Sequence, residues 1–208
     1  MKKILIFATG SKTGGGSGFE VFQEAIKKNV IQDAEVVAVV SNIENGGVRE
    51  RAHRLGIPFV YFDGKDNTAE QYNRIASQCN ADFVFFLGWL LKSSGLDPAT
   101  TVNIHPSLLP KYGGKGMYGH HVHEAVFENN EKFSGCTIHF VTKEFDKGPM
   151  IAQIVINVST AESPEEVGKR VNVQEHEWHP FYANLVIQRD IAWDGINPSS
   201  LRIPDSFA

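Results

Sequence analysis

The chain has 208 residues, of which 42% are hydrophobic and 21% are charged, a composition typical of a folded domain that buries a sizeable core. Its net charge of −4 disfavours broad binding to nucleic acid, and its apolar runs are far shorter than the ~20 residues of a membrane helix. Cys79 and Cys136 provide neither a disulfide framework nor a metal-binding spacing. We therefore expect a reduced, cytoplasmic protein that binds neither nucleic acid nor a membrane.

Strands and helices alternate over the first half of the chain. Five segments have the character of strands, and the first of them is a continuous apolar run, as expected of a strand that is buried on both faces. They cover residues 3–8, 35–41, 59–62, 82–87 and 101–105. Between the early runs, apolar residues recur at helical spacing. This alternation predicts an α/β fold with a doubly wound, mostly parallel sheet.

The pattern changes in the second half. A helix is expected over 120–129, and two strands over about 135–142 and 150–157 follow each other without a helix between them. Such a pair predicts an antiparallel strand in the C-terminal half of the sheet. Ser163 is a good N-cap for a last helix, in which Pro180 predicts a kink or an interruption.

A glycine-rich segment from Gly10 to Gly18 joins the first expected strand to the first expected helix. Ligands of open α/β sheets bind at the carboxyl ends of the strands, and a helix N-terminus offers free N–H groups to an anion. The spacing is not that of a P-loop, and Ser41-Asn42 stands where a dinucleotide site needs an acidic residue. The segment therefore favours a simple phosphate monoester, with a merely flexible loop as the alternative.

Asn103 and His105 lie two residues apart on an expected strand, so both side chains project from one face while Ile104 points into the core. An amide beside an imidazole can stabilise a carbonyl oxygen that gains negative charge. Alternatively, both side chains only cap neighbouring backbone. Asp146 lies in a Gly-Pro turn, where a carboxylate commonly makes a simple Asx-turn. From the residues alone, a catalytic role stays open for all three.

Four stretches of the chain together resemble a known family. They read Asn103-Ile-His-Pro-Ser-Leu-Leu-Pro-Lys-Tyr112, Gly135-Cys-Thr-Ile-His-Phe-Val141, Phe145-Asp-Lys-Gly-Pro149 and Gln174-Glu-His176. They resemble the phosphoribosylglycinamide formyltransferase family of folate-dependent formyltransferases, and the likeness extends to about residue 190. It implies a Rossmann-like formyltransferase fold. It also implies transfer of a formyl group from 10-formyltetrahydrofolate to the amine of glycinamide ribonucleotide, in de novo purine biosynthesis.

On this resemblance, Asn103, His105 and Asp146 are the catalytic residues. The substrate amine attacks the formyl carbon, and the Asn103 amide and a protonated His105 donate to the oxyanion that forms. The Asp146 carboxylate accepts the amine's proton through water. The resemblance implies neither a metal nor a covalent intermediate.

The resemblance also implies which residues bind the two small molecules. It implies that Gly16, Ser17 and Gly18 bind the substrate phosphate and that Glu175 binds the substrate amine. Folate contacts, chiefly through backbone groups, are implied for Gly88, Trp89, Leu90, Leu91, Phe140 and Val141. Trp89 can equally be a core residue. His121 and His139 are implied as supporting residues.

Three features set the chain apart from the family pattern. The glycine segment is longer than usual and lacks an Asn, and Lys12 within it either meets the phosphate or is solvated. Residues 113–119 lengthen the link after Tyr112, where they cover the active site or contact a partner subunit; a monomer and a homodimer both stay open. The histidines at 120, 121 and 123 lack the spacing of a zinc-binding helix.

We expect residues 1–208 to form one domain, because the sequence has no internal repeat and no linker. Its N-terminal half, about 1–100, is expected to bind phosphate. Residues 101–193 are expected to carry folate binding and catalysis, followed by a turn-rich tail over 194–208.

Other functions remain alternatives to glycinamide ribonucleotide formylation. Within the same superfamily they are a nucleotide-sugar N-formyltransferase and a formyltetrahydrofolate deformylase, although we see no regulatory domain of the deformylase kind. From a different class comes a non-catalytic nucleotide- or folate-binding module. The presence of Asn103, His105 and Asp146 together argues against that last alternative.

Overall fold

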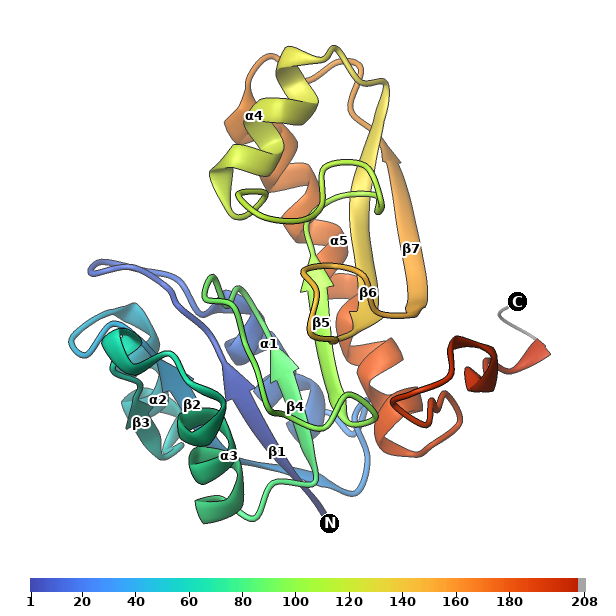
Figure 1. Cartoon of the computed structure of the whole chain (residues 1–208). Coiled ribbons are helices and arrows are strands. Elements are labelled where there is room, and N and C mark those ends of the chain that lie inside the picture. The colour runs from blue at the N-terminus through green and yellow to red at the C-terminus, as the bar shows by residue number, and fades with distance from the viewer. Residues whose placement is uncertain (206–208) are drawn as a thin grey trace.

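The computed structural model describes residues 1–205, which build one seven-stranded sheet in the order β3-β2-β1-β4-β5-β6-β7 (Figure 1). The strands are β1 (Lys2–Phe7), β2 (Ala34–Ser41), β3 (Phe59–Tyr61), β4 (Phe83–Phe86), β5 (Thr101–His105), β6 (Phe133–Phe140) and β7 (Met150–Asn157). The pairs among β1 to β5 are parallel, whereas β6 runs antiparallel to both β5 and β7. The predicted α/β class and mostly parallel sheet are confirmed.

The helices begin and end at residues suited to those positions. They are α1 (Ser17–Lys27), α2 (Gly47–Leu55), α3 (Ala69–Gln78), α4 (His120–Glu128) and α5 (Pro164–Ile187), with short 3₁₀ turns η1 (Gly64–Asp66) and η2 (Pro198–Ser200). The Ser163 side chain accepts a hydrogen bond from the Glu166 N–H, as expected of an N-cap. Gly56 ends α2 with a φ of 70°, a conformation that glycine adopts at little cost.

The side chains of β1 divide the interior into two cores. Ile4 and Ile6 face a core to which α1 and α5 contribute, whereas Leu5 and Phe7 face a smaller core that contains Tyr72 of α3. Alternate residues of a strand point to opposite faces, and both faces of a parallel sheet are covered. This is why residues 3–8 form a continuous apolar run.

The helix α5 is not interrupted at Pro180, contrary to one of the two outcomes that the sequence predicts. Proline removes one backbone hydrogen bond from a helix. Here, both halves of α5 are held by buried side chains in the larger core, among them Val171 before the proline and Ala183 after it. Packing against the sheet therefore outweighs the local cost.

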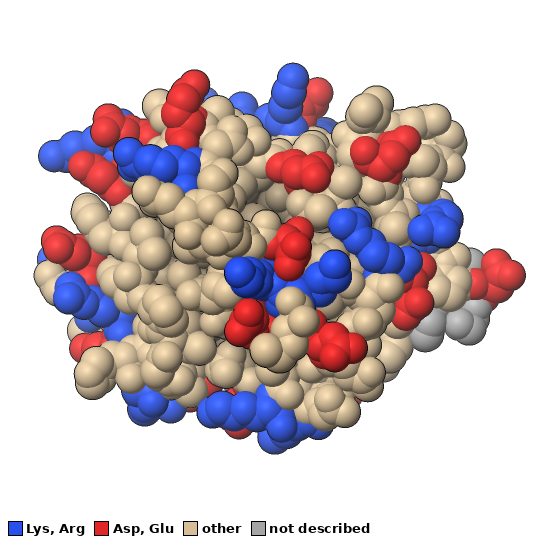
Figure 2. All heavy atoms as spheres, turned by 90° about the horizontal axis from the view of Figure 1, so that it is seen from below, with Lys and Arg blue, Asp and Glu red and all other residues tan. Residues whose placement is uncertain are grey.

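The parallel strands end at a common edge of the sheet. The carboxyl ends of β1, β4 and β5 point the same way, toward α4 and the segment that precedes it (Figure 1). At the opposite end, acidic and basic side chains are interspersed over the described surface (Figure 2). Among residues 1–205, no helix combines the length and the apolar character needed to cross a membrane.

Trp89 should contribute strongly to stability. Its indole is 8% exposed, lies 5.2 Å from the Phe7 and Phe62 rings between centroids, and donates a hydrogen bond of 3.0 Å to the Tyr72 hydroxyl. Trp89→Ala is expected to lower the free energy of unfolding by about 3–5 kcal/mol, measured by denaturant titration. Leu90→Ala, at a half-exposed neighbour, should change it by less than about 0.5 kcal/mol. Equal effects of the two variants would contradict this role for Trp89.

Candidate functional site

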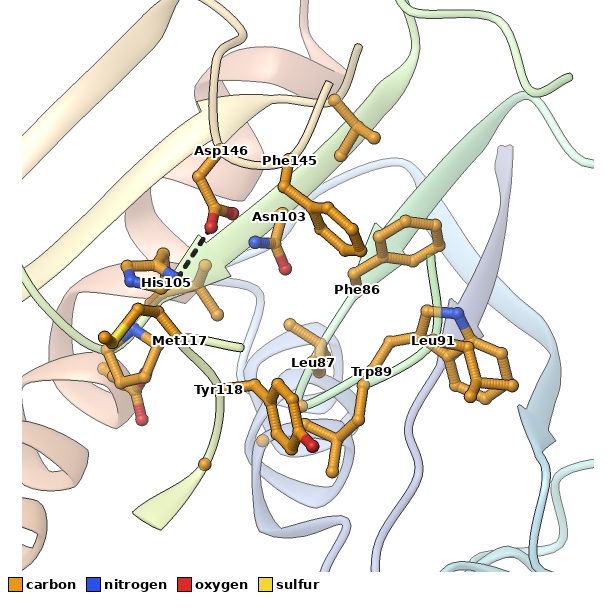
Figure 3. Close-up of a pocket in the computed structure, with 18 of the residues that line it drawn as sticks. Phe86, Leu87, Trp89, Leu91, Asn103, His105, Met117, Tyr118, Phe145 and Asp146 are labelled. Carbon is orange, nitrogen blue, oxygen red and sulfur yellow. Dashed lines mark ion pairs between the residues drawn. The ribbon is translucent and has the colours of Figure 1, made fainter. Parts of the chain in front are cut away.

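A cleft of about 760 Å³ lies where the strands β1, β4 and β5 end. Its walls come from the glycine segment after β1, the residues that follow β4, the end of β5, residues 114–119, the loop between β6 and β7, and one face of α5. Figure 3 shows Asn103, His105 and Asp146 on one side of this cleft, with Phe86, Phe145 and Tyr118 around it. All three polar residues therefore line one cleft.

Asn103 and His105 lie on the strand β5, and Asp146 lies in the turn after β6. His105 Nδ1 lies 3.6 Å from Asp146 Oδ2. On the neighbouring strand β6, His139 pairs in register with Asn103, and its Nε2 lies 3.6 Å from Asp146 Oδ1. The carboxylate thus lies between two imidazoles, and His139 joins the three residues as the sequence expects of a supporting residue.

His105 is buried, with 4% of its side chain exposed. Its Nε2 lies 2.8 Å from the Tyr112 carbonyl, and because a carbonyl only accepts, Nε2 carries a hydrogen. Burial lowers the pKa of His105 below 6.5, and neither the Asp146 charge nor the Tyr112 carbonyl compensates fully. At neutral pH, His105 is therefore largely neutral, with its Nδ1 lone pair toward Asp146.

Asp146 stays ionised although it is largely buried. Burial alone would raise the pKa of its carboxyl, but the contact with His139, the charge of His105 and the Gly114 N–H together hold it below the ordinary 3.8. The Gly114 N–H donates to Oδ2 at 2.8 Å. Asp146 itself adopts a φ of 54°, an uncommon conformation that its neighbours have to hold in place.

The Asn103 amide is oriented by His139. Asn103 Nδ2 donates to His139 Nε2 at 3.1 Å, while His139 Nδ1–H donates to the Phe140 carbonyl at 2.8 Å. Because an amide nitrogen carries two hydrogens, one of them stays available to a ligand in the cleft. The arrangement can therefore offer an N–H donor to a carbonyl oxygen.

The glycine segment forms a tight turn that leads directly into α1. Gly15 and Gly16 have φ values of 89° and 77°, and a Cβ on Gly15 would overlap Gly10. Gly16 is the N-cap of α1 and supplies no side-chain cap, so the first N–H groups of the helix, at Ser17 and Gly18, have no side-chain acceptor there. The turn can therefore accept an anion, and Arg51 supports it by donating to the Gly15 carbonyl at 2.7 Å.

One face of α5 lines the cleft beside the glycine segment. Asn172, Glu175, His176 and His179 all line the cleft, and His176 Nε2 lies 3.2 Å from Ser17 Oγ. Burial raises the pKa of Glu175 to about 7, although the Asn172 amide, which donates to it at 3.0 Å, acts in the other direction. Glu175 therefore changes charge near neutral pH, and its ionised form can bind a cationic or amide group.

The residues expected to bind folate divide into two groups. Gly88, Trp89, Leu90, Leu91 and Val141 line the cleft. The Thr9 hydroxyl accepts the Leu90 N–H at 3.0 Å, which ties this strip to the glycine segment. Phe140 has no exposed surface and belongs to the larger core, and most of the Trp89 indole is in the smaller one. Phe140 therefore does not contribute its side chain to the cleft.

On the helix α4, the histidine that lines the cleft is His123 and not the expected His121. His121 is 61% exposed and bonds to Glu124 at 3.0 Å, outside the residues that line the cleft. His123 lines it instead, and burial lowers its pKa to about 4. No group of three or more His, Cys, Asp or Glu side chains within residues 1–205 is arranged to hold a metal ion.

Sequence reasoning missed three kinds of cleft residue. The α5 side chains at 172, 176 and 179 share a helical face with Glu175, so the spacing of three or four residues is a signal that could have found them. The residues at 117 and 118 belong to the long segment whose role stayed open. Tyr112 and Gly114 act through backbone atoms, which leave no residue-type signal in a sequence.

The chain is similar to proteins of known family. Residues 2–182 match the family model of the formyl transferases. The chloroplastic phosphoribosylglycinamide formyltransferase of Arabidopsis thaliana is 34% identical over 207 residues, which cover 94% of this chain and 69% of the plant protein. The phosphoribosylglycinamide formyltransferase of Escherichia coli is 33% identical over 199 residues, which cover 87% of this chain and 90% of the bacterial protein.

A solved structure extends the likeness to the fold. The crystal structure of glycinamide ribonucleotide transformylase 1 from Symbiobacterium toebii superposes with a TM-score of 0.85, covers 99% of this chain and 95% of its own, and is 24% identical in sequence. At this identity the superposition shows a shared fold. Family model, relatives and fold agree, and the chain belongs to the formyl transferase family, among its phosphoribosylglycinamide formyltransferases.

Proposed function

We propose that this protein transfers a formyl group from 10-formyltetrahydrofolate to the amine of glycinamide ribonucleotide, a step of de novo purine biosynthesis. The observation that carries the proposal is that Asn103, His105 and Asp146 share one cleft with an uncapped helix N-terminus suited to a phosphate. The names of the relatives from Arabidopsis thaliana and Escherichia coli agree with this acceptor.

The two substrates would enter the cleft from different walls. The phosphate of the ribonucleotide would accept from the N–H groups of Ser17 and Gly18, which places its amine near Glu175 on α5. The folate co-substrate would lie along Gly88 to Leu91 and beside Val141. The formyl group would then lie against the strand β5, between the two substrate sites.

The proposed chemistry is a direct attack of the amine on the formyl carbon. A C–N bond forms, the formyl oxygen becomes an oxyanion, and the free hydrogen of the Asn103 amide donates to it. Asp146 accepts the proton of the attacking nitrogen through water and shares it with His105 Nδ1, and the imidazolium that forms keeps its two N–H groups on Asp146 and the Tyr112 carbonyl. When the oxyanion collapses, the bond to the folate N10 breaks and the proton passes to that nitrogen.

The proposal also covers the division of the chain, the localisation of the protein and its oligomeric state. Residues 1–100 would supply the phosphate site, and residues 101–193 folate binding and catalysis. Three residues of the 194–208 tail, 206–208, lie outside the described structure. We expect a cytoplasmic enzyme that works as a monomer or a homodimer, with reduced folate and glycinamide ribonucleotide as its small-molecule partners.

The direct test is an assay of formyl transfer with purified protein and 10-formyltetrahydrofolate. Glycinamide ribonucleotide and an aminosugar nucleotide are offered as acceptors in separate reactions, and the products are identified by mass spectrometry. We expect formylated glycinamide ribonucleotide only. Formylation of the sugar nucleotide alone, release of free formate, or no turnover at all would each overturn the proposed acceptor.

Asp146→Asn should lower kcat by about 100-fold or more, because an amide cannot accept the proton of the attacking amine. The KM values for both substrates should change little, since the amide keeps the size of the carboxyl group. Glu144→Gln, on the same loop, is the matched control and should stay near the wild-type rate. Steady-state kinetics of the two variants test this role. A normal kcat for Asp146→Asn would show that Asp146 does not accept the proton.

Glu175→Gln should weaken binding of glycinamide ribonucleotide in a pH-dependent way. With a pKa of about 7, the carboxyl is mostly neutral at pH 6 and mostly ionised at pH 8, where it can hold an amine as an ion. Titration calorimetry should therefore find similar affinities for wild type and variant at pH 6, and a difference of about tenfold at pH 8. Glu177→Gln, on the exposed face of α5, should match wild type at both values. Equal affinities for Glu175→Gln and wild type at pH 8 would exclude the contact.

A further inference from the structure

The segment Tyr112–Gly114 reaches both proposed acid–base residues with backbone atoms. The Tyr112 carbonyl accepts the His105 Nε2–H at 2.8 Å, and the Gly114 N–H, two residues later, donates to Asp146 Oδ2 at 2.8 Å. The same Oδ2 is the atom that faces His105 Nδ1 at 3.6 Å. One short stretch of chain therefore contacts both members of the pair.

The segment has a shape that few sequences can adopt. Tyr112 and Gly114 have φ values of 56° and 92°, both in the region that favours glycine. A Cβ on Gly113 would overlap Leu109 and approach the Asp146 Cβ to 3.4 Å. The Gly113-Gly114 pair therefore lets the backbone come close enough to Asp146 for the hydrogen bond to form.

The segment is anchored outside the cleft. The Tyr112 hydroxyl donates to Glu131 Oε1 at 2.7 Å, and the Lys111 ammonium group bonds to the same oxygen. Glu131 follows α4 and does not line the cleft. Ser107 Oγ donates to the carbonyl of Tyr112 at 3.2 Å from the other side. Contacts remote from the reacting atoms thus hold the backbone that meets His105 and Asp146.

We infer that Tyr112–Gly114 is a positioning clamp, anchored on Glu131, that fixes the tautomer of His105 and the orientation of the Asp146 carboxylate. The inference rests on the roles proposed above for these two residues. With Nε2–H committed to the Tyr112 carbonyl, Nδ1 is the nitrogen left to exchange a proton. With Oδ2 bound to the Gly114 N–H, the carboxylate presents that oxygen to Nδ1.

The clamp has a measurable effect on the titration of Asp146. The groups that face this carboxyl are His105 from β5, His139 from β6 and the Gly114 N–H, while Lys143, Glu144 and Lys147 belong to its own loop. A hydrogen bond to the ionised form stabilises that form, so its loss raises the pKa of Asp146. Activity that needs the carboxylate is then lost at a higher pH as the solution is acidified.

Gly114→Ala and Gly116→Ala form a matched pair for the test. Both glycines have φ near 90° with open space around a Cβ, so alanine strains the backbone similarly at both positions, but only at 114 does relief of that strain move an N–H that donates to Asp146. We expect Gly114→Ala to lower kcat by about tenfold and to raise the pKa of Asp146 by about one unit, with Gly116→Ala leaving that pKa in place. Equal kcat values and equal Asp146 titrations for the two variants would overturn the clamp.

The anchor is tested by Tyr112→Phe against Lys111→Ala. Each removes one partner of Glu131, but the Lys111 side chain is 65% exposed and its ion pair contributes little, so Tyr112→Phe should lower kcat about threefold or more at unchanged KM, and Lys111→Ala should lower it less. Carbon NMR titration of the Asp146 carboxyl, in wild type and Gly114→Ala, adds a readout that needs no turnover. A wild type without formyl transfer refutes the proposed function, whereas an unshifted Asp146 titration in Gly114→Ala refutes the clamp.

Discussion

A buried carboxylate has to be compensated, and Asp146 obtains its compensation from three separate segments of the chain. His105 comes from β5, His139 from β6, and the Gly114 N–H from the segment between β5 and α4. An unpaired buried charge would cost several kcal/mol or simply take up a proton. The lowered pKa of Asp146 shows that the partners outweigh the burial.

The change of strand direction at β5 is what makes the arrangement possible. The parallel strands bring the glycine segment, the Gly88–Leu91 strip and the Asn103–His105 pair to one edge of the sheet. The strand β6 then runs back beside β5, which places His139 opposite Asn103. The loop after β6 leaves the sheet beside Thr101, at the start of β5, and Asp146 within this loop reaches both imidazoles.

The sequence predicts the parts of the site that depend on periodicity. Alternation along a strand was enough to place Asn103 and His105 together and Ile104 in the core, where it is 8% exposed. The partnership with Asp146, 41 residues after His105, needed the family resemblance, because nothing in the local pattern of a Gly-Pro turn points to another strand. Packing in the core determines which of the other predicted residues reach the cleft. Phe140 alternates into the larger core instead of the cleft.

Backbone contacts and burial cannot be predicted from the sequence for a different reason. Hydrogen bonds from the Tyr112 carbonyl and the Gly114 N–H involve atoms that every residue possesses, so only the glycine-rich shape of the segment marks them. On α4, the exposed His121 and the cleft-lining His123 differ in environment, not in residue type. On α5, the cost of Pro180 is outweighed by core contacts that a helical pattern does not reveal.

The two carboxylates of the cleft are shifted in opposite directions, and this separates their tasks. Hydrogen bonds and an imidazole hold the pKa of Asp146 below its ordinary value, whereas burial with one amide donor raises that of Glu175 to about 7. Around neutral pH, Asp146 is therefore constantly ionised, while Glu175 responds to the charge of whatever lies beside it. Groups whose environments drive their pKa values apart commonly divide acid–base roles in one site. Here one carboxylate stays ionised beside His105, and the other titrates near neutral pH in the same cleft.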